Sequence, residues 1–255
     1  MRASGHSAVM SQRVDPLDGL DDFPTQPWGA RALEAHVLPA MGLSLSGRRV
    51  WEPAAGRGIM AAVFREARAE VITSDVHRYR DGAPLDLCGS FVGEGCDIAH
   101  VRDVDIIATN PPFSLALEFV LRGLAEARVA VAMLCRSNWA EGVERYERLF
   151  KPHPPAMIAQ FVERLPMTAG ATYQGEGGIR FQAHRGGYDP EASTATSYSW
   201  FVWRAGARGD NGFGDTRTIW IPPCRKQLER PDDARRFGKI RTAPAADLST
   251  IKGSA

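Results

Sequence analysis

The sequence predicts an α/β fold with a doubly wound sheet whose strands are covered on both faces. Short apolar segments alternate with stretches of helical spacing along most of the 255 residues, and this alternation is typical of strand–helix–strand units. Three of the apolar segments end at residues that can bind ligands, namely Glu52, Asp75 and Asn110. Ligands of open α/β sheets bind at the carboxyl ends of the strands, so we expect these residues at one edge.

The length and the 44% hydrophobic content suit one sizeable domain with short appendages. We predict a flexible polar tail over residues 1–21, a single domain over 22–204 and an extension with a polar tail over 205–255. Residues 165–195 contain six glycines and show no sustained period. A segment of this kind inside a domain indicates a long loop on the substrate side.

Composition argues against a polycationic protein, a membrane protein and a metal-binding protein. The net charge is +1, so any nucleic-acid surface must be a local patch. No apolar stretch reaches the roughly 18 residues of a membrane span, and the four cysteines show no Cys-x-x-Cys spacing. We therefore expect a reduced, metal-free, cytoplasmic protein that does not enter membranes.

The individual elements follow from spacing and from turn residues. A loop with two prolines at 23–28 precedes a predicted helix over 30–38, and further helices are predicted over 59–67 and 114–127, the latter capped by Ser114. A loop and a helix are expected over 136–150. Strands are predicted over residues 48–52, 70–75, 105–109, 129–134, 157–162 and 196–203, with a poorly defined one near Asp86.

A glycine turn follows the strand that ends at Glu52. Gly56 and Gly58 allow the backbone to turn tightly and to approach a ligand that a Cβ would exclude. Together with Ala61 they also match the Gly-x-Gly-x-x-Ala fingerprint of dinucleotide-binding proteins. Asp75 ends the next strand, where a carboxylate can accept hydrogen bonds from both hydroxyls of a ribose.

The strand over 105–109 stops at Asn110-Pro111-Pro112-Phe113. The prolines fix a turn and have no N–H, so the turn offers only acceptors, the Asn110 side-chain oxygen and the Pro111 carbonyl. Two fixed acceptors match the two hydrogens of a planar amino group, and Phe113 offers a ring on which a flat base can stack. The turn therefore predicts a site for an amino group on a base.

Asn-Pro-Pro-Phe at a strand end resembles the motif of the amino-methyltransferases that methylate adenine in DNA or RNA with S-adenosylmethionine. The resemblance covers residues 22–230 and implies the seven-stranded, Rossmann-like sheet of class I methyltransferases. It also implies roles in cofactor binding. Glu52, with the backbone around Ala54, Gly56 and Gly58, would hold the amino-acid moiety, Asp75 the ribose and Asp86 the adenine amino group.

Three sets of residues keep two interpretations each. Thr25 and Trp28 lie where a segment of the resembling enzymes closes over the methionine end of the cofactor, but Trp28 could equally plug the edge of the sheet. Trp139 either approaches the substrate or packs against a neighbouring helix. Arg180 and Phe181, in the glycine-rich loop, suit contacts with a nucleic-acid backbone and its bases, or they are solvated.

Two further segments are similar to phage and prophage methyltransferases: Glu141-Gly142-x-x-Arg145 with Phe150, and Trp-Ile-Pro-Pro-Cys-Arg-Lys at 220–226. They favour DNA over RNA as the substrate. Methylation of a protein glutamine, an inactive nucleic-acid-binding relative and a nicotinamide oxidoreductase remain alternatives. About 50 residues separate the glycine turn from the Asn-Pro-Pro-Phe turn, which leaves no room for a large recognition domain. A short target, a relaxed context, a partner subunit or self-association is expected instead.

Overall fold

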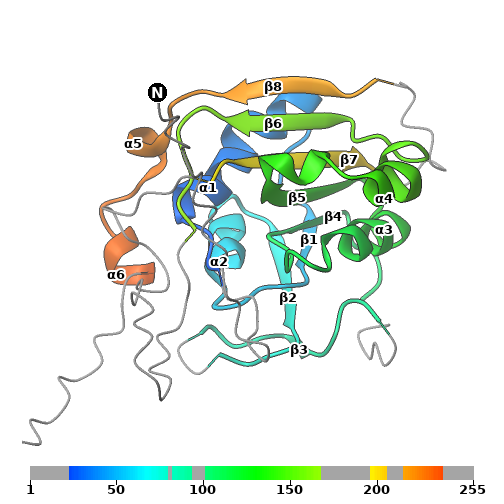
Figure 1. The fold of residues 1–255 in the computed structure, drawn as a ribbon. Coiled ribbons are helices and arrows are strands. Elements are labelled where there is room, and N and C mark those ends of the chain that lie inside the picture. The colour runs from blue at the N-terminus through cyan, green and yellow to red at the C-terminus, as the bar shows by residue number, and fades with distance from the viewer. Residues whose placement is uncertain (1–22, 80–81, 94–100, 168–195, 206–214, 238–255) are drawn as a thin grey trace, which may run out of the picture.

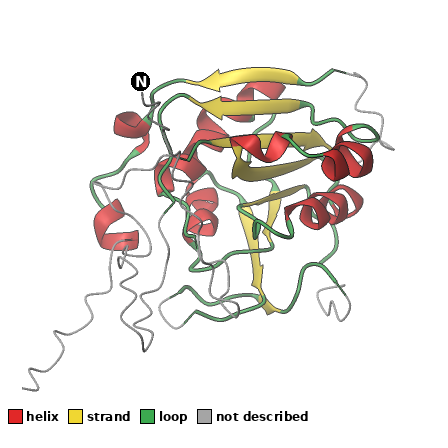
Figure 2. Ribbon diagram, viewed as in Figure 1, coloured by secondary structure: helices red, strands yellow, loops and turns green. Residues whose placement is uncertain are grey.

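The computed structural model describes residues 23–79, 82–93, 101–167, 196–205 and 215–237, which form one sheet with helices on both faces (Figures 1 and 2). Its strands are β1 Arg49–Glu52, β2 Glu70–Asp75, β3 Leu87–Cys88, β4 Ile106–Thr109, β5 Ala130–Arg136, β6 Met157–Phe161, β7 Tyr198–Arg204 and β8 Arg217–Ile221. The order across the sheet is β3-β2-β1-β4-β5-β7-β6-β8. The predicted doubly wound α/β fold is confirmed, with eight strands where seven were expected.

The strand order reverses between β1 and β4. β1 leads to β2 and β3 on one side, β4 leads to β5 on the other, and all five strands are parallel. β7 runs antiparallel to β5 and β6, and β8 is parallel to β6. Ligands of doubly wound sheets bind at the carboxyl ends of the strands where the order reverses. In this chain those ends are Glu52, on β1, and Asn110, just after β4.

The described helices are mostly short. They are α1 Pro27–Ala32, α2 Ile59–Glu66, α3 Ala116–Glu126, α4 Val143–Arg145, α5 Arg225–Leu228 and α6 Asp233–Phe237, with the π-helical turns η1 Leu33–Val37 and η4 Tyr146–Phe150 and the 3-10 turns η2 Pro39–Met41 and η3 Ser137–Ala140. α1 begins with a proline at its first position, where no N–H is needed. The expected cap at Ser114 is wrong, because α3 begins after Leu115 without a side-chain cap.

Two apolar cores lie on the opposite faces of the sheet. β4 is buried along its whole length, and its successive side chains point to opposite faces. Ile106 and Ala108 belong to the core that includes side chains of α1 and α2. Ile107 belongs to the other core, with Phe119 and Val120 of α3. This double burial explains the continuous apolar run before Asn110.

The described part of the C-terminal extension packs on the same body. β8 adds an edge strand beside β6, and Ile221 and Cys224 are buried in the core that contains α1. The other four residues of β8 are exposed or half-buried, and Trp220 is 69% exposed. An edge strand of this kind has no apolar period, and for that reason the sequence did not predict it.

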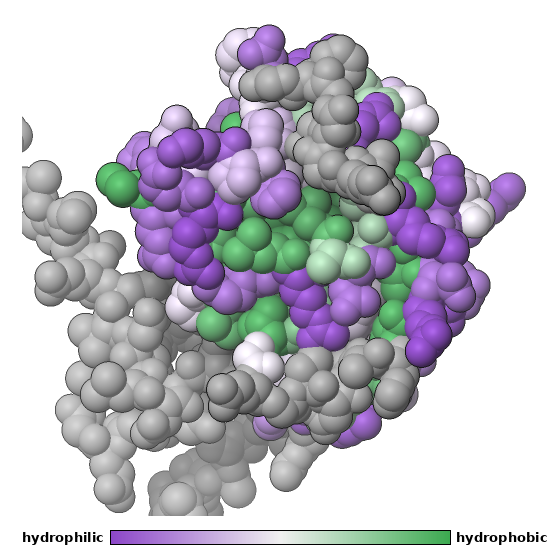
Figure 3. All heavy atoms as spheres, turned by 90° about the vertical axis from the view of Figure 1, so that its right-hand side faces the viewer, coloured by the Kyte–Doolittle hydropathy of each residue, from purple (hydrophilic) through white to green (hydrophobic). Residues whose placement is uncertain are grey.

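The side of the molecule at the right of Figure 1 is hydrophilic along its outline, with apolar residues toward its middle (Figure 3). α3 and α4 lie on this side. Arg148 pairs with Glu144 at 2.6 Å and with Glu118 at 3.3 Å. Such exposed pairs contribute little to stability. Among the described helices, none is long and apolar enough to cross a bilayer.

Candidate active site

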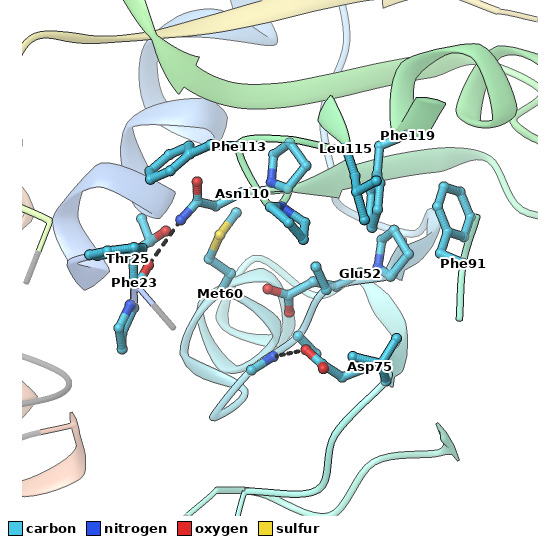
Figure 4. A pocket seen from close by; sticks show the side chains of 18 of the residues that line it. Phe23, Thr25, Glu52, Met60, Asp75, Phe91, Asn110, Phe113, Leu115 and Phe119 are labelled. Atoms are coloured by element: carbon cyan, nitrogen blue, oxygen red, sulfur yellow. Dashed lines mark hydrogen bonds between the residues drawn. The ribbon is translucent and has the colours of Figure 1, made fainter. Parts of the chain in front are cut away.

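A cavity of about 270 Å³ lies at the carboxyl ends of β1, β2 and β4 (Figure 4). Its walls come from several separate segments of the chain. They are formed by residues 23–25, 52–57, 59, 60, 75, 76, 79, 90–92, 110–115 and 119. Glu52 and Asp75, which end β1 and β2, and Asn110, which follows β4, therefore line one cavity. Figure 4 shows Asp75 and Glu52 toward one end and Asn110 toward the other, with Met60 between them.

Asn110 presents an amide oxygen to which no described residue donates a hydrogen bond. Its Nδ2 donates a hydrogen bond of 2.9 Å to the carbonyl oxygen of Phe23 (Figure 4). Because a carbonyl can only accept, this bond fixes which way the amide faces. The Oδ1 atom is buried, and no donor from the described residues bonds to it. A buried acceptor of this kind costs free energy until a bound molecule supplies a hydrogen.

The two prolines after Asn110 keep the turn free of donors. The Pro112 carbonyl accepts a hydrogen bond of 3.0 Å from the Leu115 N–H. The Pro111 carbonyl accepts none from the part of the chain that the structure describes. Neither proline has an N–H. The turn thus offers two acceptors, Asn110 Oδ1 and the Pro111 carbonyl, as the sequence predicted.

The Phe113 ring lies at the Asn110 end of the cavity. The Phe23 ring lies 5.4 Å from it, centroid to centroid, with an angle of 33° between the ring planes. The guanidinium carbon of Arg136 lies 4.2 Å from the centroid of the Phe113 ring. Phe113 is half-buried and lines the cavity. An aromatic ring therefore lies next to the two acceptors.

Glu52 brings a buried carboxyl to the opposite end of the cavity. Its side chain is 1% exposed, and Oε2 has no hydrogen-bond partner among the described groups. Burial raises the pKa of Glu52 well above its ordinary value, and the charge of Asp75 adds to the rise. A hydrogen bond from the backbone N–H of Ala61, in the first turn of α2, acts in the opposite direction. The free oxygen suits a cationic or hydroxyl group of a ligand.

Asp75 is held in place by the backbone around it. Its Oδ2 accepts a hydrogen bond of 2.8 Å from the Gly56 N–H, and its Oδ1 accepts one of 3.0 Å from the His77 N–H. Burial raises the pKa of Asp75, and these hydrogen bonds oppose the rise. The carboxylate therefore links the end of β2 to the glycine turn after β1, and it faces the cavity (Figure 4).

The glycine turn has the backbone geometry that its sequence predicted. Gly56 and Gly58 have φ angles of +52° and +80°, which disfavour any residue with a Cβ. A Cβ at Gly58 would also lie 2.9 Å from the Cβ of Ala83. Ala54 and Gly56 line the cavity, whereas Gly58 does not. Gly58 thus serves the turn itself.

Thr25 and Trp28 have different places in the structure. Thr25 lines the cavity, is 3% exposed and has an Oγ1 without a partner in the described chain. Trp28 is fully buried, does not line the cavity and packs edge-on against Phe161 at 5.5 Å. Of the two interpretations of Trp28, the structure favours the packing role, because the ring fills the core beneath α1.

Asp86 is also away from the cavity. Its Oδ2 accepts hydrogen bonds of 2.8 Å from both the N–H and the hydroxyl of Thr73. Its own N–H donates to the Thr73 hydroxyl at 3.1 Å. Asp86 therefore ties its loop to β2, which argues against its expected contact with an adenine amino group. Ser90, Phe91 and Val92 line the cavity from the same part of the chain.

The residues that were expected near the substrate are Trp139, Arg180 and Phe181, and the structure describes only the first of them. Trp139 is 9% exposed and packs edge-on against Phe150 and Phe201, so it is a core residue and not a substrate contact. Arg145 donates to the Trp139 carbonyl at 2.8 Å, which gives this segment a structural role. Arg180 and Phe181 lie outside the described residues. In the described ranges no group of His, Cys, Asp or Glu is arranged to hold a metal ion.

Some cavity residues had no signal in the sequence. Phe23 contributes its backbone carbonyl to Asn110, and a carbonyl leaves no trace in a residue pattern. Met60, Tyr79 and Phe91 reach the cavity from a helix and from loops. Their spacing in the sequence matches no ligand-binding motif, and only the packing of separate segments brings the three residues together.

No family model matches the chain, and no curated protein sequence matches it. Solved structures resemble it in fold. One is a putative class I S-adenosylmethionine-dependent methyltransferase from Listeria monocytogenes, with 11% identity, a TM-score of 0.44 and coverage of 74% of this chain and 61% of that one. A putative RNA methyltransferase from Pyrococcus horikoshii has 14% identity, a TM-score of 0.41 and coverage of 65% and 78%.

A third is an S-adenosylmethionine-dependent O-methyltransferase from Thermotoga maritima, with 16% identity, a TM-score of 0.39 and coverage of 67% of this chain and 64% of that one. The chain thus spans less than two thirds of the length of the Listeria and Thermotoga structures. The likeness concerns the fold alone.

Proposed function

We propose that the chain is an S-adenosylmethionine-dependent methyltransferase that acts on the exocyclic amino group of adenine in nucleic acid, with DNA favoured over RNA. The observation that carries the proposal is the buried Oδ1 of Asn110, which has no donor in the described chain and is fixed by the bond from Nδ2 to Phe23. An amino group supplies the missing hydrogens. The neighbouring Pro111 carbonyl is a second acceptor for them.

The other end of the cavity fits the cofactor. Glu52 would bind the α-amino group, which is cationic and satisfies the free Oε2. Asp75 would accept the ribose hydroxyls, while the turn at Ala54 and Gly56 lies against the ligand without large side chains. The cofactor, when bound, supplies an electrophilic methyl group. Thr25 Oγ1 is a further unsatisfied group in the same cavity.

The first turn of α2 argues against a dinucleotide. A pyrophosphate normally binds the free N–H groups at such a helix terminus. Here the Ala61 N–H already bonds to the Glu52 carboxyl. A pyrophosphate beside Glu52 and Asp75 would meet two acidic groups instead of free donors. The nicotinamide oxidoreductase alternative is therefore disfavoured.

The acceptors act on the reactivity of the amino nitrogen. The lone pair of an adenine amino group is spread into the ring, so the nitrogen is a weak nucleophile. Hydrogen bonds to Asn110 Oδ1 and to the Pro111 carbonyl are best formed when the nitrogen becomes pyramidal, and they favour the transition state over the ground state. An uncharged amide suffices, because the proton can leave after transfer. Rigid prolines keep both acceptors in position.

Phe113 favours a base over a glutamine amide as the substrate. A ring beside the acceptors can stack on a flat base, whereas a glutamine side chain gains less from it. A base within a duplex would have to leave the helix to reach Asn110. The segments at 141–150 and 220–226 resemble phage enzymes and support DNA. RNA adenine and protein glutamine remain the competing substrates.

Replacement of Asn110 by alanine tests the proposal. Asn110→Ala removes the acceptor, and we expect a loss of roughly 10²- to 10³-fold in methyl transfer, as for other single positioned hydrogen-bonding groups. Thermal stabilisation by S-adenosylmethionine should persist, because Glu52 and Asp75 are intact. Asn138→Ala, at an exposed position, is the matched control and should transfer normally. Normal turnover by Asn110→Ala would overturn the proposed role.

A further inference from the structure

Arg136 packs against Phe113, a residue of the cavity wall, and has no counter-ion among the described residues. It is the last residue of β5 and pairs with Tyr198, the first residue of β7. Its guanidinium carbon lies 4.2 Å from the centroid of the Phe113 ring. Arg136 does not line the cavity, whereas Phe113 does. The cation thus sits immediately behind the ring on which the target base is proposed to stack.

The guanidinium of Arg136 has unused donors. No carboxylate of the described residues lies within 4.0 Å of it, and its buried Nε has no acceptor among the same residues. Other arginines of the described chain are engaged: Arg148 pairs with Glu144 and Glu118, and Arg31 with Glu66 and Asp233. A desolvated donor without an acceptor costs free energy, so a bound molecule would relieve that cost.

We propose that Arg136 binds a phosphate of the nucleic-acid strand next to the target adenine. The inference rests on the proposed function, because it assumes that a base occupies the site between Asn110 and Phe113. A phosphate flanking that base would lie outside the cavity and close to Phe113, against which Arg136 packs. A guanidinium presents five donors in a plane and binds phosphate through two of them at once. Stacking on Phe113 would fix the orientation of that plane.

The charge of the chain makes such a contact important. The net charge of the whole protein is +1, so attraction to a polyanion has to come from local cations. Each phosphate contact releases a counter-ion from the nucleic acid and adds about 0.9 to the salt dependence of binding for duplex DNA, or about 0.7 for a single strand. The contribution of Arg136 to the salt dependence of nucleic-acid binding can therefore be measured separately from catalysis.

The test measures binding of the full chain to a fluorescent adenine-containing DNA duplex and to an RNA hairpin, between 50 and 300 mM salt. Arg136→Met keeps apolar packing on Phe113 but removes the charge. We expect weaker binding at low salt and a slope of log affinity against log salt that is smaller by about 0.7 to 0.9. Arg136→Lys should keep most of the slope. The control is Arg102→Met. Arg102 is exposed and lies just before β4, near the amino ends of the strands and away from Asn110, so this variant should bind like the unmodified chain.

Each outcome decides the inference. A slope for Arg136→Met equal to that of the unmodified chain would overturn it, even if methyl transfer fell, because Arg136 would then only support the Phe113 ring. In that case the proposed function stands. If the unmodified chain binds neither DNA nor RNA, the nucleic-acid substrate and the phosphate contact both fall. The arm that shows the larger change between the unmodified chain and Arg136→Met identifies DNA or RNA as the source of the phosphate.

Discussion

Glu52 lines the cavity and has a buried carboxyl oxygen, Oε2, that no described group satisfies. The residue lies at the end of β1, and its burial raises the pKa of the carboxyl. An unliganded protein therefore bears a cost at Glu52 that a cationic ligand would relieve. Glu52 should contribute more to ligand affinity than to the stability of the free protein.

Glu52→Gln tests this role of Glu52 by two measurements, the affinity for S-adenosylmethionine and the unfolding temperature of the free protein. In the proposed complex it loses an ionic hydrogen bond of about 1.5–3 kcal/mol, so affinity for S-adenosylmethionine should fall roughly 10- to 100-fold by calorimetry. Without ligand the variant should unfold at a higher temperature at neutral pH, because an amide avoids the cost of a buried charge. Glu70→Gln, at an exposed position on β2, should change neither. Unchanged affinity in Glu52→Gln would place the α-amino group elsewhere.

The pH dependence of stability has a definite sign. The folded pKa of Glu52 lies above the ordinary value of 4.5, so between these two values the folded state holds a proton that the unfolded state has lost. Stability should therefore fall as pH rises from about 4.5 through the folded pKa. Thermal unfolding across this range should show a smaller fall in Glu52→Gln, with a remainder from Asp75. An equal fall in both proteins would contradict the assignment to Glu52.

At the scale of elements, a buried ion cluster joins the two ends of the described chain. Arg31 of α1 is 7% exposed and donates to Asp233 of α6 at 2.6 and 2.7 Å. It also donates to Glu66 of α2 at 2.9 Å and to the Leu228 carbonyl at 2.7 Å. Burial would raise the pKa of Asp233, but the bonds from Arg31 hold it below the ordinary value. α1 and α2 are thus tied to the C-terminal helices, and α2 contributes Ile59 and Met60 to the wall of the cavity.

Removal of Asp233 should weaken this junction. Asp233→Ala leaves the buried Arg31 guanidinium with only Glu66 and the Leu228 carbonyl as partners, and we expect a loss of about 3 kcal/mol in the free energy of unfolding by denaturant titration. Asp232→Ala is the control. Its carboxylate is 41% exposed and lies 3.8 Å from Arg236, so it should lose less than about 1 kcal/mol. Equal losses in the two variants would mean that the Arg31 cluster does not secure the extension.

At the scale of the whole molecule, local patterns predicted the sheet and the strand ends. Glu52, Asp75 and Asn110 could be placed together because parallel strands bring their carboxyl ends to one edge. The Arg31–Asp233 pair could not, since its members are 202 positions apart and no spacing rule joins them. β8 lacked an apolar period because it is an edge strand. The sequence allowed both a site role and a core role for Trp28 and for Trp139. Only the packing of Trp28 against Phe161 and of Trp139 against Phe201 shows that both rings belong to the core.

The measurement that tests adenine methylation most directly is transfer of a labelled methyl group from S-adenosylmethionine to unmethylated duplex DNA, structured RNA and cell protein in parallel, followed by nucleoside analysis. Asn110→Ala is the reference without the acceptor. We expect label on the adenine amino group, mainly in DNA, and little with the variant. Adenine label in RNA would change only the type of nucleic acid. Label confined to protein, or absent from all three, would contradict the proposed function.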